Sequence, residues 1–229
     1  MSCAGRARDG ATRLHARPGR AAQPLAPGTH PLHLRERRDS ILYVPESLAP
    51  DRPAPLVVYL HGATGDEQQG LRRMGPFADQ FRFVLLSPAS EGGTWDAIRG
   101  GYGADVQSLD RALTRVFETC NVDPERIAVS GFSDGASYAL GLGLSNGDLF
   151  RHVMAFSPGF VPQAVEPQGH PRVFISHGTA DQILPIERCS RQIVPELKRS
   201  KYDVTFREFD GPHTLPRDVG EAAMRWFVG

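Results

Sequence analysis

RIAVSGFSDGAS, residues 126–137, is the stretch that decides the fold of this chain. Its first part, Arg126–Ser130, is a short apolar run of the kind that forms a strand buried on both faces of a sheet. Its second part, Gly131-Phe132-Ser133-Asp134-Gly135, is a G-x-S-x-G pattern, which in this context predicts a sharp turn from strand to helix. Small residues two positions before and after Ser133 let strand and helix approach closely, so the serine is held strained with its hydroxyl exposed. The alternative is a glycine-rich helix start with Ser133 as its N-cap.

The same buried-strand signature recurs on both sides of this stretch. Further strands are expected over residues 30–36, 40–45, 56–60, 82–87, 152–157 and 172–177, with an outer strand over 204–209. Helical spacing of apolar residues predicts helices over 104–120, 137–144, 186–200 and 217–227, the third of them kinked or restarted at Pro195. Strands that alternate with helices imply right-handed crossovers, so we predict a mostly parallel central sheet with helices on both faces, an α/β fold.

The length and composition fit one such domain. With 229 residues, of which 40 % are apolar, the chain can bury a sizeable core without disulfides or metals. We assign residues 29–229 to the domain and residues 1–28 to an N-terminal tail or edge segment, partly flexible, with an edge strand expected at 11–16. The arginine-rich, acid-poor start also resembles an organelle transit peptide.

Charge and cysteine content exclude several classes of protein. Lys+Arg and Asp+Glu are equal at 26 each, which disfavours general affinity for nucleic acid. No run approaches the roughly 18 apolar residues that a membrane span needs. The cysteines, Cys3, Cys120 and Cys189, are too far apart for a disulfide framework or a zinc site. Free thiols suit a reducing compartment, so we expect a cytoplasmic protein.

Ligands of parallel α/β sheets bind at the carboxyl ends of the strands, so the residues after each strand are the candidates for chemistry. A serine hydroxyl needs a base within hydrogen-bond reach, and the base needs an orienting acid. His213 follows the last predicted strand and Asp181 follows the strand before it, which gives the chain order Ser, Asp, His expected for such a fold. Asp203 and Asp210 are the alternative acids, although Asp203 opens a strand and Asp210 lies only three residues before His213.

An oxyanion would need preorganised donors near Ser133. The expected donors are the backbone N–H of Asp134, directly after the serine, and that of Ala63, in the loop after the strand 56–60. A simple glycine turn is the alternative for that loop. Trp95 lies in a predicted loop over 91–103, where it either walls a substrate pocket or anchors the loop.

The sequence predicts neither a metal nor a cofactor. It contains no HExxH or CxxC pattern, no GxGxxG after a strand and no Walker A lysine. His177, at a predicted strand end, is interpreted as a structural turn histidine with a hydrogen-bonded ring.

Four motifs in this order resemble the α/β-hydrolase superfamily and, within it, the phospholipase/carboxylesterase group, with feruloyl-esterase-like and polyhydroxybutyrate-depolymerase-like relatives. They are LHGATGD (60–66), GFSDGAS (131–137), HGTADQILP (177–185) and GPHTLP (211–216). The resemblance implies an α/β-hydrolase fold and carries Ser133, Asp181 and His213 over as a catalytic triad, with Ala63 and Asp134 as oxyanion donors.

The sequence departs from the group at two positions beside the serine. Asp134 stands where the group often has glutamine, so a carboxylate next to the oxyanion site is expected to affect affinity for anionic substrates. Ala136 replaces a second glycine, which is a mild change.

The function implied is that of a serine carboxylesterase that hydrolyses soluble short- to medium-chain or aryl esters, with a small-molecule ester as its partner. No long insertion separates the strands, so no large lid is expected. A peptidase, an amide hydrolase or a thioesterase with the same triad are alternatives, as is a non-catalytic binding protein on a hydrolase scaffold. The sequence does not give an oligomeric state.

Overall fold

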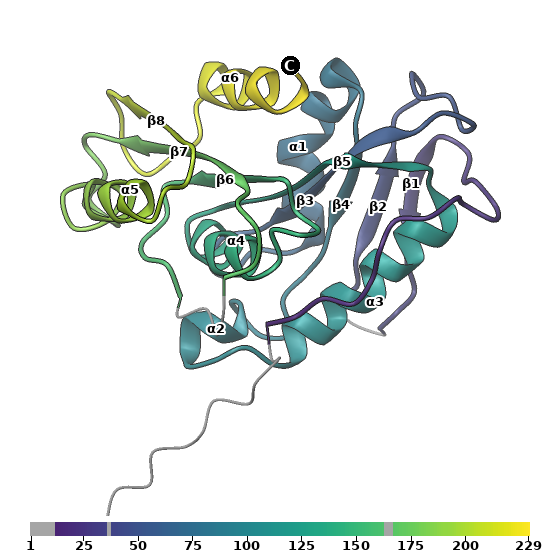
Figure 1. Cartoon of the computed structure of the whole chain (residues 1–229), viewed down its shortest axis with the longest axis horizontal. Helices are drawn as coiled ribbons and strands as arrows, with labels where there is room; N and C mark the ends of the chain where they lie inside the picture. The colour runs from purple at the N-terminus through teal and green to yellow at the C-terminus, as the bar shows by residue number, and fades with distance from the viewer. Residues whose placement is uncertain (1–11, 36–37, 163–166) are drawn as a thin grey trace, which may run out of the picture.

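The computed structural model describes residues 12–35, 38–162 and 167–229, and a twisted sheet runs through the centre of this part (Figure 1). Eight strands follow the spatial order β1-β2-β4-β3-β5-β6-β7-β8. Pairing is antiparallel for β1 with β2 and for β2 with β4, and parallel from β4 to β8. The strands are β1 (Gly28–Pro31), β2 (Ile41–Val44), β3 (Ala54–Leu60), β4 (Val84–Ser87), β5 (Val122–Phe132), β6 (His152–Phe156), β7 (Arg172–Gly178) and β8 (Val204–Phe209).

Helices cover both faces of this sheet, as predicted (Figure 1). They are α1 (Glu67–Phe81), α2 (Asp96–Arg99), α3 (Ala104–Thr119), α4 (Asp134–Ser145), α5 (Ser190–Arg199) and α6 (Arg217–Val228). On one face α1 and α6 bury Met74 and Met224 against Tyr59 of β3. On the other, α3, α4 and α5 pack against the opposite side chains of the strands, such as Val58. The alternation of side chains along each strand therefore divides the core into two layers.

The largest difference from the sequence-based expectation is α1, which no prediction contained. Its interior holds Gly70, Gly75 and Pro76, which are poor helix formers, and these masked its pattern. Gly70 is required by packing, because a Cβ there would lie 2.0 Å from the Ser87 hydroxyl at the end of β4. A single turn, α2, also interrupts the loop expected over 91–103.

The other boundaries moved by a few residues. The first strand lies at Gly28–Pro31 rather than 30–36, a range of which residue 36 falls outside the described part. The third predicted helix begins at Ser190 instead of 186 and contains Pro195 in its interior.

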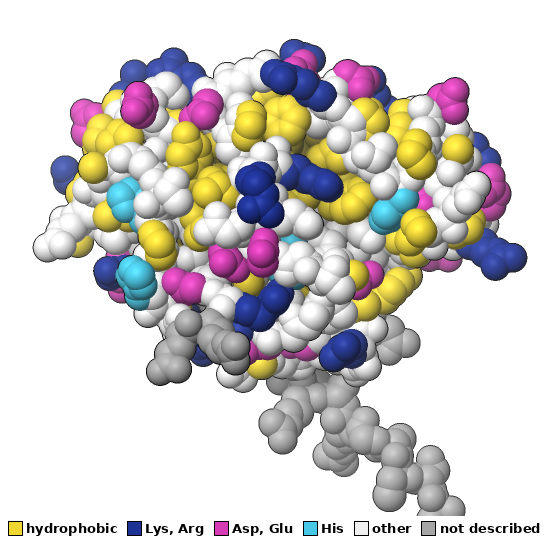
Figure 2. All heavy atoms as spheres, turned by 180° about the vertical axis from the view of Figure 1, so that it is seen from behind, with side chains coloured by type: hydrophobic (Ala, Val, Ile, Leu, Met, Phe, Trp, Pro, Cys, Tyr) yellow, Lys and Arg dark blue, Asp and Glu magenta, His cyan; other side chains and the backbone are white. Residues whose placement is uncertain are grey.

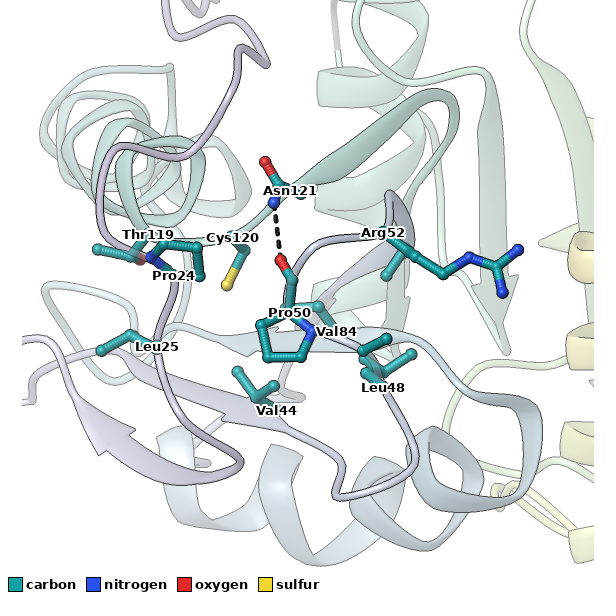
Figure 3. Close-up of a pocket in the computed structure, with 12 residues that line it drawn as sticks. Pro24, Leu25, Val44, Leu48, Pro50, Arg52, Val84, Thr119, Cys120 and Asn121 are labelled. Atoms are coloured by element: carbon teal, nitrogen blue, oxygen red, sulfur yellow. Dashed lines mark hydrogen bonds between the residues drawn. The ribbon is translucent and has the colours of Figure 1, made fainter.

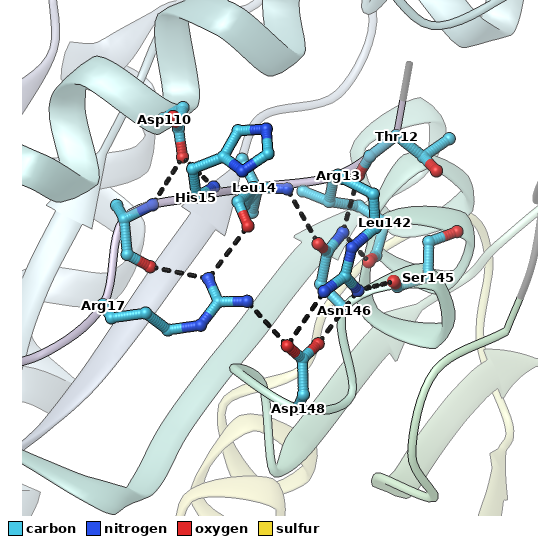
Figure 4. Close-up of polar contacts among 11 residues, drawn as sticks. Thr12, Arg13, Leu14, His15, Arg17, Asp110, Leu142, Ser145, Asn146 and Asp148 are labelled. Carbon is cyan, nitrogen blue, oxygen red and sulfur yellow. Dashed lines mark hydrogen bonds and ion pairs between the residues drawn. The ribbon is translucent and has the colours of Figure 1, made fainter. Parts of the chain in front are cut away.

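Residues 12–25, here called the N-terminal strap, pack along α3 and α4 (Figure 4). Leu14 is 1 % exposed and belongs to the core on that side. The Arg13 guanidinium donates two hydrogen bonds to Asp148, at 2.9 and 3.0 Å, and Arg17 donates another at 2.6 Å. The edge strand expected at 11–16 is not formed over residues 12–16, the part of that range that the structure describes. The backbone N–H groups of Leu14, His15 and Ala16 donate to side chains there and not to another strand.

An apolar groove lies at the amino ends of β3, β4 and β5, the edge of the sheet opposite to the one where ligands of such folds bind (Figure 3). Leu25, Val44, Leu48 and Cys120 are among its lining residues. Burial raises the pKa of the Cys120 thiol to about 11, so this cysteine is not a thiolate at neutral pH. Among the residues described, no helix is long and apolar enough to cross a membrane.

Candidate active site

Ser133 lies at the turn between β5 and α4, with backbone angles φ 57° and ψ −121°. This is a strained conformation for a residue with a side chain, and two glycines permit it. A Cβ at Gly131 would lie 2.3 Å from the carbonyl oxygen of Gly135, and a Cβ at Gly135 would lie 2.1 Å from the carbonyl oxygen of Leu60. The Ser133 side chain makes no capping hydrogen bond to α4, which argues against the N-cap alternative.

Folding brings His213 to this serine across 80 residues of sequence. The His213 Nε2 lies 2.9 Å from the Ser133 Oγ, and the Nδ1 lies 2.5 Å from the Asp181 Oδ2. A neutral ring with its proton on Nδ1 donates to the carboxylate and accepts from the hydroxyl. The ring also packs at 4.7 Å from the ring of Phe132, the residue before the serine.

Neither alternative acid is the partner of His213, whose Nδ1 faces Asp181. Asp203, at the start of β8, is paired with Arg172 at 3.0 Å. Asp210 is exposed to solvent.

The carboxylate of Asp181 is buried and fully hydrogen-bonded. Its Oδ1 accepts from the backbone N–H groups of Ile183 at 2.9 Å and Leu184 at 2.8 Å, and its Oδ2 faces two imidazoles, those of His213 and His177. Burial raises the pKa of Asp181, but the hydrogen bonds from Leu184, His213 and Ile183 outweigh it and hold the pKa below its usual range. The Asp181 carboxyl group is therefore ionised at every pH at which His213 could act as a base.

The second imidazole, that of His177, was expected to be a structural turn histidine, and its ring is indeed hydrogen-bonded. Its Nδ1 lies 2.7 Å from the Ser190 hydroxyl and its Nε2 lies 2.7 Å from the Leu184 carbonyl oxygen and 3.1 Å from the Asp181 Oδ2. A carbonyl can only accept, so Nε2 carries the proton and Ser190 donates to Nδ1. Burial lowers the pKa of His177, so the ring is neutral and its one N–H points at the acid side of the site.

The loop 61–65, after β3, presents the second expected oxyanion donor. Among the described residues, neither the Ala63 N–H nor the Asp134 N–H donates a hydrogen bond to a protein group. His61 fixes the loop, since its Nδ1 lies 2.7 Å from the Gly62 carbonyl oxygen and its Nε2 accepts from the Ser90 N–H at 3.0 Å.

Arg38 braces the same loop from outside, a role that sequence reasoning missed. Its guanidinium donates at 2.7 Å to the carbonyl oxygens of both Gly65 and Ser90. Two loops that are separate in sequence are thereby joined beside the expected oxyanion position.

The loop after β4 also reaches the nucleophile turn. The Thr94 hydroxyl donates to the Asp134 carboxylate at 2.6 Å, which ties this loop to the residue directly after the serine. Trp95 is fully buried, donates from Nε1 to the His61 carbonyl oxygen at 2.9 Å and stacks on Tyr138. With no exposed surface, Trp95 fits the loop-anchoring interpretation and does not line a substrate pocket.

The described residues contain no group of three His, Cys, Asp or Glu side chains placed to hold a metal ion. The site itself combines an oriented base on a hydroxyl with two N–H groups that have no protein partner among the described residues.

Comparison with known proteins supports this interpretation. The sequence model of the Phospholipase/Carboxylesterase family matches residues 103–224, just over half of the chain. The bifunctional acetylxylan esterase/xylanase XynS20E of Neocallimastix patriciarum is 31 % identical over 154 residues, which is 64 % of this chain and 22 % of that protein. An acetylxylan esterase of Coprinopsis cinerea is 33 % identical over 122 residues, 48 % of this chain and 32 % of that one. The chain thus spans only a fifth to a third of these two relatives.

Among solved structures, esterase PE8 superimposes with a TM-score of 0.65 at 22 % identity, covering 81 % of this chain and 95 % of that one. At this identity the likeness concerns the fold. Together with the family match it confirms the predicted α/β-hydrolase fold, and the described residues contain no large cap domain.

Proposed function

Because the chain belongs to the phospholipase/carboxylesterase family, we propose that it is a serine esterase that hydrolyses carboxylic esters through Ser133, His213 and Asp181. One observation carries the proposal: His213 lies 2.9 Å from the serine hydroxyl through one ring nitrogen and 2.5 Å from a buried carboxylate through the other. A base oriented in this way makes a serine hydroxyl nucleophilic at neutral pH.

In the proposed reaction the Ser133 Oγ attacks the ester carbonyl carbon while His213 Nε2 takes the hydroxyl proton. Asp181 keeps the proton of the ring on Nδ1 and stabilises the imidazolium that forms. The imidazolium then gives its proton to the departing alcohol, which leaves an acyl group on the serine. Water activated by His213 hydrolyses that acyl-enzyme in the reverse order.

The negative oxygen of each tetrahedral intermediate is assigned to the N–H groups of Ala63 and Asp134. Both are free of protein partners within the described residues, and the bracing of loop 61–65 holds one of them in place before substrate binds. Preorganised donors of this kind are worth about 3 kcal/mol each in the barrier.

The proposed substrates are small carboxylic esters with short- to medium-chain or aryl groups. The absence of a large cap in the described residues favours soluble substrates over an aggregated lipid surface. The two relatives named as acetylxylan esterases favour acetyl esters among the candidates to test. A comparison of each ester with its matched anilide separates esterase from amide hydrolase activity.

Replacing Ser133 with alanine tests the proposal directly. Hydrolysis of p-nitrophenyl acetate and butyrate is expected to fall at least about 10³-fold in Ser133→Ala, because the nucleophile is lost while the fold is kept. A fluorophosphonate probe should label the wild-type protein and leave Ser133→Ala unlabelled.

Ser130→Ala is the matched control for that experiment. Ser130 lies on β5, is fully buried and has no hydrogen-bond partner for its hydroxyl, so its loss should leave turnover nearly unchanged. Turnover that persists in Ser133→Ala would contradict the assignment of Ser133 as the nucleophile. A folded wild-type protein that hydrolyses no ester would contradict the assignment as an esterase.

A further inference from the structure

Two carboxylates are buried among the described residues, that of Asp181 in the candidate triad and that of Asp105 near the start of α3. The other described Asp and Glu side chains are at least partly exposed, as the acidic groups on the face seen in Figure 2 illustrate. Asp105 is only 1 % exposed. A buried carboxylate is costly unless it is paired or strongly hydrogen-bonded, so the contacts of Asp105 indicate which part of the fold requires it.

The Asp105 carboxylate closes the loop between β4 and α2. Its Oδ1 accepts from the Glu91 N–H at 2.6 Å, and its Oδ2 accepts from the Asp96 N–H at 2.7 Å. The Asp105 N–H in turn donates to the Asp96 carboxylate at 3.0 Å. One side chain thereby fixes both ends of residues 91–96, here called the clipped loop.

The residues of the clipped loop do little to order it by themselves. It contains Gly92 and Gly93, and glycine loses more conformational freedom on folding than any other residue. A Cβ on Gly93 would have no heavy atom within 4 Å, and a Cβ on Gly92 would have none closer than 3.7 Å, so the backbone is not packed on that side. The order of this loop therefore depends on hydrogen bonds to other segments.

The clipped loop holds the turn that carries the Ala63 N–H. The Gly93 carbonyl oxygen accepts from the Thr64 N–H at 2.6 Å. Thr64 has φ 60°, in the left-handed region that favours glycine, which is a strained conformation for a β-branched residue. Such a turn persists only where its surroundings fix it, and the clipped loop is part of those surroundings.

The clipped loop also contacts the residue that provides the second expected donor. The Thr94 hydroxyl donates to the Asp134 carboxylate at 2.6 Å. Trp95 donates from Nε1 to the His61 carbonyl oxygen at 2.9 Å, just before the strained turn. The N–H groups of Ala63 and Asp134 thus belong to two segments that the same loop joins.

We infer that Asp105 is a positioning residue of the proposed esterase, and that its ionised carboxylate preorganises the oxyanion donors through the clipped loop. The inference rests on the proposed function and adds to it a residue outside the triad. Preorganised donors act mainly in the transition state, so a looser loop should lower kcat and change KM little.

Asp105→Asn tests this assignment. An amide has one acceptor oxygen and two N–H donors, so it turns a donor toward one of the two backbone N–H groups and cannot accept from both ends of the clipped loop. We expect kcat for p-nitrophenyl butyrate to fall about 10- to 100-fold, with KM changed less than about threefold. Thermal melting checks the fold, and fluorophosphonate labelling taken to completion gives the concentration of sites.

Asp110→Asn is the matched control on the same helix. The Asp110 Oδ1 also accepts from two backbone N–H groups, those of His15 at 2.6 Å and Ala16 at 2.9 Å, but these belong to the N-terminal strap. The substitution removes the same charge from α3 without touching the clipped loop. The kcat of its folded fraction should equal that of the wild type.

A second variant tests the same contacts without changing a buried charge. Thr94→Val removes the hydroxyl that joins the clipped loop to Asp134 and keeps the shape of the side chain. We expect kcat to fall about three- to tenfold, again with KM nearly unchanged. This variant decides the question if Asp105→Asn does not fold.

The charges around Asp105 allow a pH test as well. Burial, opposed by the hydrogen bonds from the Glu91 and Asp96 N–H groups, raises the pKa of Asp105 to about 6, and the negative charges of Asp96 and Glu91 add to the rise. Glu91 is paired with Arg35 at 2.7 Å. Tyr138 of α4 donates to the Asp96 carboxylate at 3.1 Å, and burial raises its pKa, so it stays uncharged.

Acid should therefore mimic the substitution. As the pH falls through about 6, Asp105 takes up a proton, becomes a poorer acceptor and releases the clipped loop, whereas Asp105→Asn has no group to titrate there. The ratio of wild-type kcat to Asp105→Asn kcat should shrink by up to about tenfold between pH 7.5 and 5. The titration of His213 is common to both proteins and cancels in this ratio.

Each outcome bears on a different claim. A kcat of folded Asp105→Asn or Thr94→Val equal to that of the wild type overturns the positioning role and leaves the esterase intact, as does an equal loss in Asp110→Asn. A kcat ratio that stays constant from pH 7.5 to 5 overturns the role of the ionised carboxylate. A folded wild type that hydrolyses no ester and resists the fluorophosphonate overturns the proposed function, and this inference with it.

Discussion

The imidazole rings of His213 and His177 share one carboxylate oxygen, that of Asp181. His213 and His177 both face the Oδ2 of Asp181, at 2.5 and 3.1 Å. The first is in contact with Ser133, whereas the second is fully buried behind the acid and touches no reacting atom. His177 is therefore a positioning residue: its N–H donates to the carbonyl oxygen of Leu184, whose amide binds the Asp181 carboxylate, and lies 3.1 Å from the Oδ2.

Removing that N–H should reduce turnover more than binding. In His177→Leu we expect kcat to fall about 10- to 100-fold with KM changed little, because a displaced Asp181 no longer orients His213, and small displacements of reacting groups are costly. His177→Gln retains an N–H donor and should recover part of the loss. Steady-state kinetics on p-nitrophenyl butyrate, normalised to sites labelled by a fluorophosphonate, give both constants.

A purely structural role for His177 gives a different result. Both variants would then melt at lower temperature, while the folded fraction kept the kcat of the wild type. The Ser190 hydroxyl and the Leu184 carbonyl lose a partner in the leucine variant, so some destabilisation is expected in either case.

Sequence reasoning proposed residues that follow strands, which the fold brings together, and did not anticipate those that join loops. Ser133, Asp181 and His213 each follow a recognisable strand, and the parallel pairing of β5 to β8 places the ends of these strands at one edge. Arg38 and Thr94 act by contacts between loops distant in sequence, at 2.7 and 2.6 Å, and no local pattern encodes such contacts. Trp95 was placed in the right loop, but its burial depends on Tyr138 and His61 from other elements.

At the scale of elements, the turn from β5 to α4 depends on how closely backbone approaches backbone. Gly135 leaves no room for a side chain, since a Cβ would lie 2.1 Å from the Leu60 carbonyl oxygen and 2.4 Å from that of His61. Both obstacles are main-chain atoms of the segment that also carries Ala63. A side chain here must therefore move β3, α4 or the oxyanion loop.

Gly135→Ala should lower the free energy of unfolding by about 1–3 kcal/mol or more, because overpacking against rigid backbone costs this much. The folded fraction should also lose activity through displacement of the oxyanion loop. Gly93→Ala is the matched control, since no heavy atom lies within 4 Å of a Cβ at that position. Urea unfolding of the two variants measures the difference, and equal midpoints would contradict the packing argument.

The elements themselves were predictable to different degrees. Buried strands such as β3 and β6 have continuous apolar runs, and the structure confirms them within two residues. Helix α1 was missed because Gly70 serves the contact with Ser87 of β4 and Pro76 lies in an exposed position, so tertiary packing overrides poor intrinsic propensity there. The first turn predicted for α5 became a separate turn before Ser190.

At the scale of the whole molecule, the N-terminal strap joins segments that are far apart in the chain. Asp148 pairs with Arg13 across 135 residues and with Arg17 across 131 (Figure 4). The hydrogen bond from Arg13, followed by that from Arg17, outweighs the burial of the group and lowers the pKa of Asp148 to about 2. A carboxyl group that is more acidic in the folded state stabilises that state above its unfolded pKa, and the gain is lost on acidification.

Asp148→Asn should therefore lower the free energy of unfolding at pH 7, and most of that effect should be lost by pH 2. A shift of this size corresponds to more than 2 kcal/mol, but the pair is 29–40 % exposed and screened by solvent, so about 1 kcal/mol is expected. The difference between variant and wild type should shrink as the pH falls from about 4 to 2. Urea unfolding at pH 7, 4 and 2 measures it.

Asp51→Asn is the control for this experiment, because Asp51 is exposed and the described residues offer it no ion pair. A difference in free energy of unfolding between Asp148→Asn and the wild type that stays constant from pH 7 to 2 would contradict this expectation. That result would show that packing, and not the ion pairs of Asp148, holds the strap in place.

The strap has a consequence for biosynthesis. The Asn146 side chain accepts a hydrogen bond from the Leu14 N–H and donates one to the Thr12 carbonyl oxygen. These partners are more than 130 residues apart in the chain and therefore leave the ribosome at different times. At ordinary translation rates residues 12–17 wait on the order of ten seconds for the far end of α4 to be made. This segment is made before its partner Asn146 and finds its place only once α4 is complete, and until then its arginines and Leu14 are open to chaperones and proteases.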